Sequence, residues 1–103
     1  MVMNMNKEKV KIVFMGTTEF AGGILKALLD NNYDVIGVVC QPDKPVGRKK
    51  ILEYPFTKKI ALENDIKIFQ PVKIRNDYKE ILDLNPDIII TCAYGQIIQK
   101  EIL

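Results

Sequence analysis

Short apolar runs alternate along this chain with longer stretches in which apolar residues recur every three or four positions. The first run covers residues 10–15 and ends at Gly16. It is long enough for a strand and too short for a buried helix. Thr17 or Thr18 can then cap a helix by accepting a backbone N–H bond, and Glu19 places negative charge where the helix dipole favours it. The pattern predicts a buried strand, a glycine turn and a helix start.

The helix predicted after this turn has an apolar stripe made of two adjacent rows, each with a spacing of four residues. The rows are Phe20, Ile24 and Leu28, and Ala21, Leu25 and Leu29. A stripe of this width is typical of a helix that lies on a sheet. Gly22 and Gly23 each cost roughly 1 kcal/mol relative to alanine in such a helix, so we expect close packing or backbone access to require them.

Three further strands and three further helices are predicted downstream. The strands are a buried one at 34–40, a short edge strand at 66–69 and a central one at 87–92. The helices are one at 56–64 with Pro55 at its start, one from Asn76 to about Leu84, and a short one at 99–103. Strands that alternate with helices imply right-handed crossovers and a parallel sheet.

The predicted fold class is therefore α/β, with one domain at 10–103 preceded by a disordered polar tail at 1–9. The expected strand order is 3-2-1-4, which puts the opening strand in the middle of the sheet. In this order the Gly16 turn lies beside a loop at Tyr94 and Gly95, at the topological switch point. Ligand crevices of open α/β sheets lie at such points.

The segment 41–55 differs in kind from the rest. Three prolines and Gly47 predict that most of it lacks regular structure, and long loops of this kind are usually functional or disordered. Residues 41–60 hold six lysine or arginine residues and two acidic ones, a local charge of +4 against +2 for the whole chain. Two interpretations stay open: a solvated surface loop, or contacts with phosphate groups.

Composition narrows the possible chemistry. No apolar run approaches the ~20 residues of a membrane span, and residues 1–9 lack the core of a signal peptide, so a cytoplasmic location is the default. The chain has no histidine, and Cys40 and Cys92 are too few for a metal site, so we expect them to be unbridged apolar residues at strand ends. A dinucleotide (NAD) fingerprint fails because Thr18 and Ala21 stand where glycines are needed.

Four segments carry a resemblance to a known family: 12–20, 38–50, 69–71 and 93–97. Together they resemble methionyl-tRNA formyltransferases, and the Gln-Pro-Asp-Lys-Pro-Val-Gly-Arg-Lys-Lys stretch is the most specific part. The resemblance implies a Rossmann-like three-layer α/β/α sandwich. It also implies transfer of a formyl group from 10-formyltetrahydrofolate, without a metal, to the methionine amino group of initiator tRNA.

Residue roles follow from the resemblance by position. It implies that Arg48, Lys49 and Lys50 approach the tRNA acceptor stem. Gly16, Thr17 and Phe20 are implied to border the methionyl pocket. The remaining group, Tyr94, Gly95 and Gln96, is implied to lie along the folate crevice and to act through backbone groups.

The departures from the family pattern also carry expectations. The family's catalytic asparagine, histidine and aspartate have no counterpart here, and Thr18 and Gln99 replace prolines. We therefore expect the N-terminal part of a formyltransferase catalytic domain, truncated before the catalytic residues and inactive alone. Two alternatives stay open: a non-catalytic RNA-binding fragment, or one that self-associates through an exposed strand edge at Ile88–Ile90.

Overall fold

The computed structural model describes residues 10–49 and 51–96 of the chain. Its strands are β1 (Lys11–Gly16), β2 (Asp34–Val39), β3 (Lys44–Val46), β4 (Ile51–Glu53), β5 (Lys67–Phe69) and β6 (Ile88–Cys92). Its helices are α1 (Glu19–Asp30), α2 (Phe56–Glu63) and α3 (Lys79–Leu82). The predicted tail at 1–9, Lys50 and the predicted helix at 99–103 lie outside the described residues. None of the helices in the described part has the length and apolar character that crossing a membrane requires.

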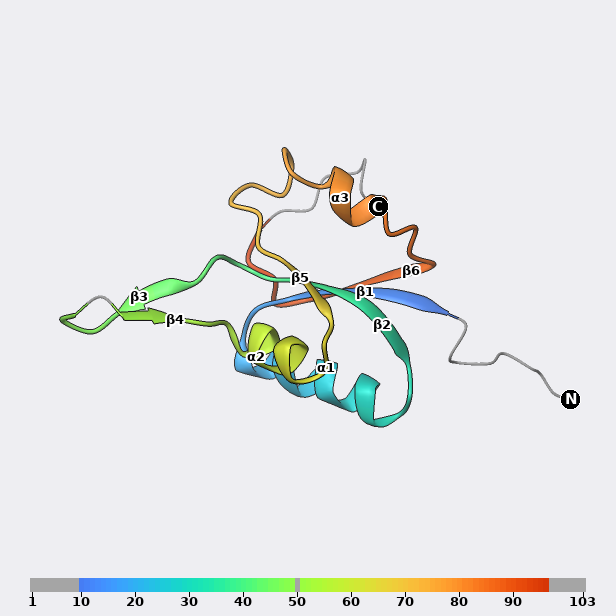
Figure 1. Ribbon diagram of the computed structural model, residues 1–103, viewed down its shortest axis with the longest axis horizontal. Helices are drawn as coiled ribbons and strands as arrows, with labels where there is room; N and C mark the ends of the chain where they lie inside the picture. Colours follow the sequence, from blue (N-terminus) through green and yellow to red (C-terminus); the bar gives the residue numbers. More distant parts are fainter. Residues whose placement is uncertain (1–9, 50, 97–103) are drawn as a thin grey trace, which may run out of the picture.

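Four strands form a parallel sheet in the order β5-β2-β1-β6 (Figure 1). The predicted order 3-2-1-4 is confirmed, because β5 and β6 are the third and fourth strands of this sheet once the separate β3–β4 pair is set aside. β1 lies in the interior of the sheet, where Phe14 pairs with Val38 of β2 and with Ile90 of β6. Strand β5 lies at an edge, as predicted for 66–69.

Layers on both faces of the sheet explain why the first strand is apolar at almost every position. Val13 and Met15 pack on one face with Ile81 of α3, whereas Phe14 packs on the other face with Leu25 of α1. Figure 1 shows α1 and α2 below the sheet and α3 above it. A strand buried on both faces needs a continuous apolar run rather than an alternating one. The structure confirms the α/β sandwich.

The predicted stripe on α1 is half right. Ala21 and Leu25 are fully buried, but Phe20 is 70% exposed and Ile24 lies at the surface too. Leu28, the third residue of the row that begins at Phe20, is partly buried and packs against the core. Helix α2 packs against α1 at Gly22, where an added Cβ would lie 3.2 Å from the Cβ of Phe56. Gly22 therefore serves close packing, whereas Gly23 has open space around it.

The prediction that most of 41–55 lacks regular structure agrees with the described residues, but it missed a short hairpin. Strands β3 and β4 pair antiparallel, with Lys44 opposite Glu53 and Val46 opposite Ile51, and form a separate two-stranded ribbon. A two-stranded ribbon leaves one side of each strand unpaired, so Pro45 and its missing N–H are tolerated. The turn between the strands contains Gly47 at φ +73°, a conformation that suits glycine. We call residues 44–53 the basic hairpin.

The third helix is shorter than predicted. α3 covers only Lys79–Leu82, and Asn76 is not its cap. The backbone N–H groups of Asn76 and Asp77 both donate to the carbonyl of Lys73, which forms a turn before the helix begins. Helix α2 agrees with its prediction, since it covers Phe56–Glu63 with Pro55 at the capping position.

We predict that Gly16→Ala lowers the free energy of unfolding by about 1–3 kcal/mol, the usual cost of overpacking a core. An added Cβ there would lie 2.7 Å from the carbonyl oxygen of Cys92 and 2.8 Å from the Cβ of Ala21. The matched control is Gly23→Ala, which meets no atom within 4 Å and should gain about 0.5–1 kcal/mol from helix propensity. Urea unfolding measures the free energy of unfolding of both variants. Equal changes in the two variants would contradict the close packing at Gly16.

Candidate functional site

The carboxyl ends of β1, β2 and β6 meet at Thr17. Its N–H donates to the carbonyl of Ala93 at 3.2 Å, and its hydroxyl donates to the carbonyl of Tyr94 at 2.6 Å. The same hydroxyl accepts from the N–H of Gln41, which follows β2, at 3.2 Å. The predicted adjacency of the Gly16 turn and the Tyr94–Gly95 loop is confirmed. We call this edge of the sheet, with the residues that follow its strands, the rim.

Helix α2 is attached to the same turn from beneath. The buried hydroxyl of Thr57 donates to the carbonyl of Gly16 at 2.6 Å. Thr18 caps α1 by accepting from the N–H of Ala21 at 3.3 Å, so of the two predicted candidates Thr18 is the cap. Thr17, Thr18 and Thr57 thus fix the turn from three directions.

Three glutamine side chains extend the rim across the sheet. Gln96 donates from Nε2 to Oε1 of Gln41 at 2.8 Å and to the carbonyl of Pro71 at 3.0 Å. Its Oε1 accepts from the N–H of Ile74 at 2.7 Å. Gln70, which follows β5, donates to the backbone carbonyl of Gln41 at 3.2 Å. The loops after β2, β5 and β6 are therefore joined by amide hydrogen bonds.

The side chains of Tyr94 and Cys40 are turned into the core at this edge. Both are buried, and the Tyr94 hydroxyl has no hydrogen-bond partner among the described residues. Burial raises the pKa of the Cys40 thiol to about 11, against a smaller opposing effect of Thr57. Burial, with a further contribution from Cys40, raises the pKa of Tyr94 to about 12. Both groups hold their protons at neutral pH, and the two cysteines are unbridged, as expected.

The Tyr94–Gly95–Gln96 loop therefore has little side-chain chemistry to offer a ligand. The Tyr94 ring is in the core, and the Gln96 amide is engaged by Gln41, Pro71 and Ile74. Gly95 has φ +104°, and an added Cβ would lie 2.7 Å from Nε2 of Gln41. The missing side chain of Gly95 therefore makes room for the Gln41 side chain, and the backbone is the part of this loop that is left to contact a ligand.

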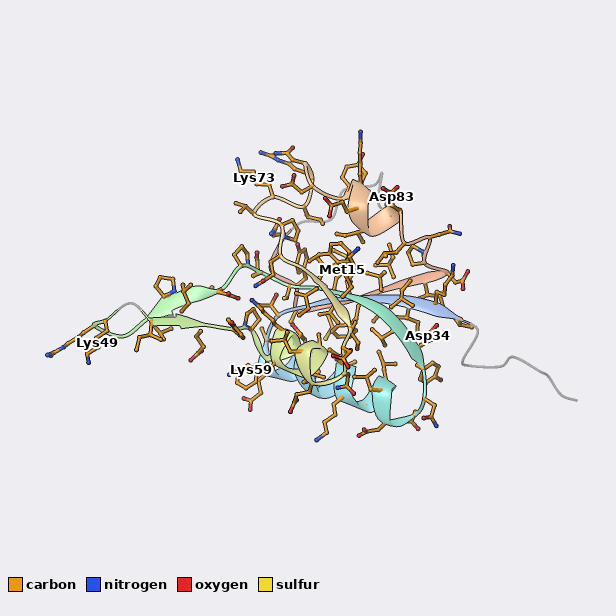
Figure 2. The ribbon with its side chains drawn as sticks, in the orientation of Figure 1. Met15, Asp34, Lys49, Lys59, Lys73 and Asp83 are labelled. Atoms are coloured by element: carbon orange, nitrogen blue, oxygen red, sulfur yellow. The ribbon has the colours of Figure 1, made fainter. Side chains whose placement is uncertain are left out.

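The basic hairpin carries its charge away from the sheet. Arg48 and Lys49 lie exposed in the turn of the hairpin, and Figure 2 shows Lys49 at its far end. Lys50 falls outside the described residues. The root of the hairpin is held by Asp43, whose carboxylate accepts from Lys58 at 3.0 Å and from Nε2 of Gln70 at 2.6 Å. The hydrogen bond from Gln70, and then Lys58, lower the pKa of the Asp43 carboxyl.

The structure brings some of the predicted site residues together and separates others. Gly16 and Thr17 lie against the loop that contains Tyr94. Phe20 is in the first turn of α1, just beyond the rim, and its ring is largely exposed. Arg48 and Lys49 lie together in the turn of the hairpin, and Figure 2 shows Lys49 at the end far from the sheet, so the two cations form a second, separate surface.

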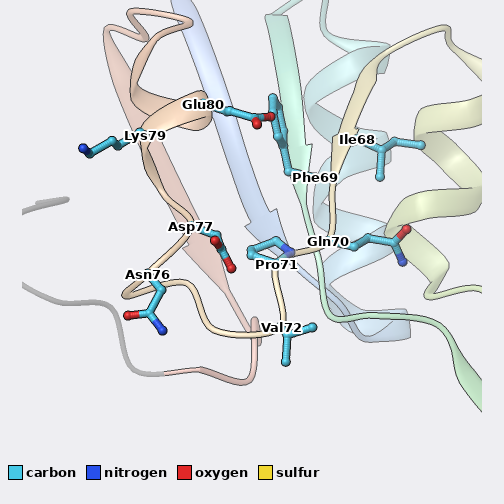
Figure 3. Close-up of a pocket in the computed structure, with 9 residues that line it drawn as sticks. All are labelled: Ile68, Phe69, Gln70, Pro71, Val72, Asn76, Asp77, Lys79 and Glu80. Atoms are coloured by element: carbon cyan, nitrogen blue, oxygen red, sulfur yellow. The ribbon is translucent and has the colours of Figure 1, made fainter.

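A groove of about 540 Å³ lies between β5 and the turn before α3, beside the part of the rim that contains Gln70 (Figure 3). Its walls combine Phe69, Pro71 and Val72 with the polar side chains of Asp77 and Glu80. Sequence reasoning gave no signal for it. Among the described residues, no group of three or more histidine, cysteine, aspartate or glutamate side chains could hold a metal ion.

Five residues that organise the rim were not singled out from the sequence: Gln41, Asp43, Thr57, Lys58 and Gln70. A usable signal existed for two of them. Gln41 comes directly after the predicted buried strand at 34–40 and Gln70 directly after the predicted edge strand at 66–69, and parallel strands end at the same edge of a sheet. Thr57 and Lys58 had no such signal, because only the packing of α2 brings them to the turn and the hairpin.

Comparison with known proteins gives the class to which this fold and rim belong. The family model described as "Formyl transferase" matches residues 9–103, and the chain belongs to this family. Curated relatives at about half identity carry the name methionyl-tRNA formyltransferase.

The relatives come from several bacteria. The protein from Malacoplasma penetrans is 54% identical over 93 residues, which cover 90% of this chain and 29% of the relative. The protein from Bacillus thuringiensis subsp. konkukian is 50% identical over 96 residues, which cover 91% of this chain and 31% of the relative. The protein from Ligilactobacillus salivarius is 49% identical over 94 residues, which cover 89% of this chain and 30% of the relative. The chain thus spans slightly under a third of the length of the curated relatives it matches.

We predict that Thr17→Val destabilises the chain by about 1–3 kcal/mol, because the Gln41 N–H and the Tyr94 carbonyl each lose a partner. Thr17→Ser keeps the hydroxyl and should stay within about 0.5 kcal/mol of the parent protein. Chemical unfolding of the two variants gives the comparison. Equal loss in both would mean that the methyl group, and not the hydroxyl, matters at the rim.

Proposed function

We propose that this chain supplies the strand-end rim and an RNA-contacting hairpin to methionyl-tRNA formylation. In that reaction a formyl group passes from 10-formyltetrahydrofolate to the amino group of methionine on initiator tRNA. The observation that carries the proposal is the family match over residues 9–103 to relatives of that name. A cytoplasmic location follows from the tRNA substrate. The supporting geometry differs for the RNA, the amino acid and the folate.

The basic hairpin supports contact with the tRNA acceptor stem. Arg48 and Lys49 are exposed cations in the turn of the hairpin, and such groups suit phosphate oxygens. Figure 2 shows Lys49 beyond the body of the domain. Exposed apolar residues, Ile51 and Leu52, lie on the adjoining strand β4. Lysine and arginine at the end of a protruding ribbon can reach a helical backbone without a clash from the sheet.

The rim supports a pocket for the methionyl group and a crevice for the folate. The exposed ring of Phe20, next to the fixed turn at Gly16 and Thr17, offers an apolar contact for a methionine side chain. The loop at Gly95 offers backbone groups to a flat ligand, since its neighbours' side chains are engaged. We therefore assign Tyr94, Gly95 and Gln96 to the folate crevice through their backbone.

We also propose that the chain alone binds RNA and the small substrates but does not catalyse formyl transfer. A formyl transfer needs a group that takes the proton of the attacking amine. At the rim, Cys40 and Tyr94 keep their protons at neutral pH, and Asp43 is engaged by Lys58 and Gln70. The chain contains no histidine. Loss of acid–base assistance costs about 10²–10⁴-fold in rate.

We predict that the purified chain does not formylate methionyl-tRNA measurably. The assay supplies charged initiator tRNA and 10-formyltetrahydrofolate and follows formyl-methionine against a reaction without protein. Turnover above that background, abolished by a substitution within this chain, would contradict the prediction.

We predict that replacing Arg48, Lys49 and Lys50 by alanine weakens binding of a short RNA duplex at low salt. The salt slope of log K should fall by about 2–3, since up to three phosphate contacts are lost. The matched control replaces Lys26, Lys73 and Lys79, which removes the same charge from other surfaces. Filter binding measures both, and equal weakening in the two triple variants would show that net charge rather than the hairpin governs binding.

A second candidate function is self-association. Strand β6 is the edge of the described sheet, and Ile88 is 47% exposed on it. Open apolar edges invite pairing with another chain. Light scattering at high concentration tests this candidate: a dimer or larger assembly supports it, and a monomer removes it.

A further inference from the structure

We infer that Asp43 is a positioning residue that, with Lys58 and Gln70, holds the basic hairpin in its RNA-contacting orientation. The inference rests on the proposed RNA contact of the hairpin. We call these three residues the clamp. It joins the root of β3 to helix α2 and to the loop after β5.

The geometry of the clamp is close and sheltered. Both carboxylate oxygens of Asp43 lie within 3.0–3.1 Å of Nζ of Lys58, and one of them accepts from Gln70 at 2.6 Å. The two charged side chains are only 14% and 19% exposed, so solvent screens their attraction less than at an open surface. Gln70 also donates to the carbonyl of Gln41, which ties the clamp to the rim.

Lys58 reaches the second strand of the hairpin as well. Its Nζ lies 3.9 Å from the centre of the Tyr54 ring, and Tyr54 directly follows β4. One ammonium group therefore contacts residues at the roots of both strands, Asp43 before β3 and Tyr54 after β4. A two-stranded hairpin is marginal on its own. Because the non-covalent contacts of Lys58 hold both ends of the hairpin against the packed helix α2, they oppose fraying of the hairpin and fix the direction in which its turn points.

The negative charge of Asp43 makes this inference testable. A carboxylate at the root of a cationic surface repels phosphate, so simple electrostatics predicts that removing it strengthens RNA binding. The clamp predicts the reverse, because a loosened hairpin must be ordered on binding and loses affinity. Glu53 is the matched control: it is an exposed acid on β4 and forms no side-chain hydrogen bond or ion pair with the described residues.

The experiment compares Asp43→Ala with Glu53→Ala in the full chain, with a short RNA duplex as the probe at low salt. We expect Asp43→Ala to weaken binding about 3-fold or more, and Glu53→Ala to strengthen it, because that variant removes a negative charge from the hairpin without breaking the clamp. Asp43→Asn, which keeps the shape of the side chain, serves if the alanine variant does not fold. Equal strengthening in the Asp43 and Glu53 variants overturns the clamp.

A second readout separates failure of the clamp from failure of the proposed RNA contact. Amide hydrogen exchange of residues 44–53 should be faster in Asp43→Ala than in the parent chain. The separate variant Lys58→Arg keeps the cation, so its exchange should be as slow as in the parent chain. Unchanged exchange in Asp43→Ala overturns the clamp whatever the RNA affinity. Faster exchange, in a chain whose RNA binding is insensitive to the triple replacement of Arg48, Lys49 and Lys50, supports the clamp and removes the RNA proposal.

Discussion

The hydroxyl group of Thr17 joins the ends of three parallel strands, and the arrangement of the rim depends on this junction. It donates to the carbonyl of Tyr94, which follows β6, and accepts from the N–H of Gln41, two residues after the end of β2, while Thr17 itself directly follows β1. The space beside residue 16, between Phe14, Ala21 and Cys92, is too small for a side chain. The junction therefore requires glycine at this position. In the proposed function, the surfaces next to this compact polar rim, Phe20 and the basic hairpin, contact the substrate.

Two surfaces with different physical character follow from this construction. The rim is tightly hydrogen-bonded and holds its titratable side chains protonated or engaged, so it suits positioning rather than proton transfer. The hairpin is exposed and cationic, and it is joined to the body of the domain through Asp43, Lys58 and Gln70. In the proposed reaction, the first surface orients small groups and the second holds the RNA backbone.

Sequence reasoning predicted the sheet because β1 is buried on both faces and its apolar run is continuous. It also predicted that Gly16 and Tyr94 meet, since parallel strands end at one edge. It missed the hairpin at 44–53, because prolines argue against a central strand but not against an isolated ribbon. It could not give the clamp, which pairs Asp43 with a residue fifteen positions away through the packing of α2.

The most direct test of the account is chemical-shift mapping of the chain during titration with a short RNA duplex that imitates an acceptor stem. The account predicts that shifts concentrate in the basic hairpin, with smaller changes at Asp43 and Lys58. Shifts centred instead on the groove beside Phe69 and Glu80, with the hairpin unaffected, would contradict the assignment of the RNA-contacting surface.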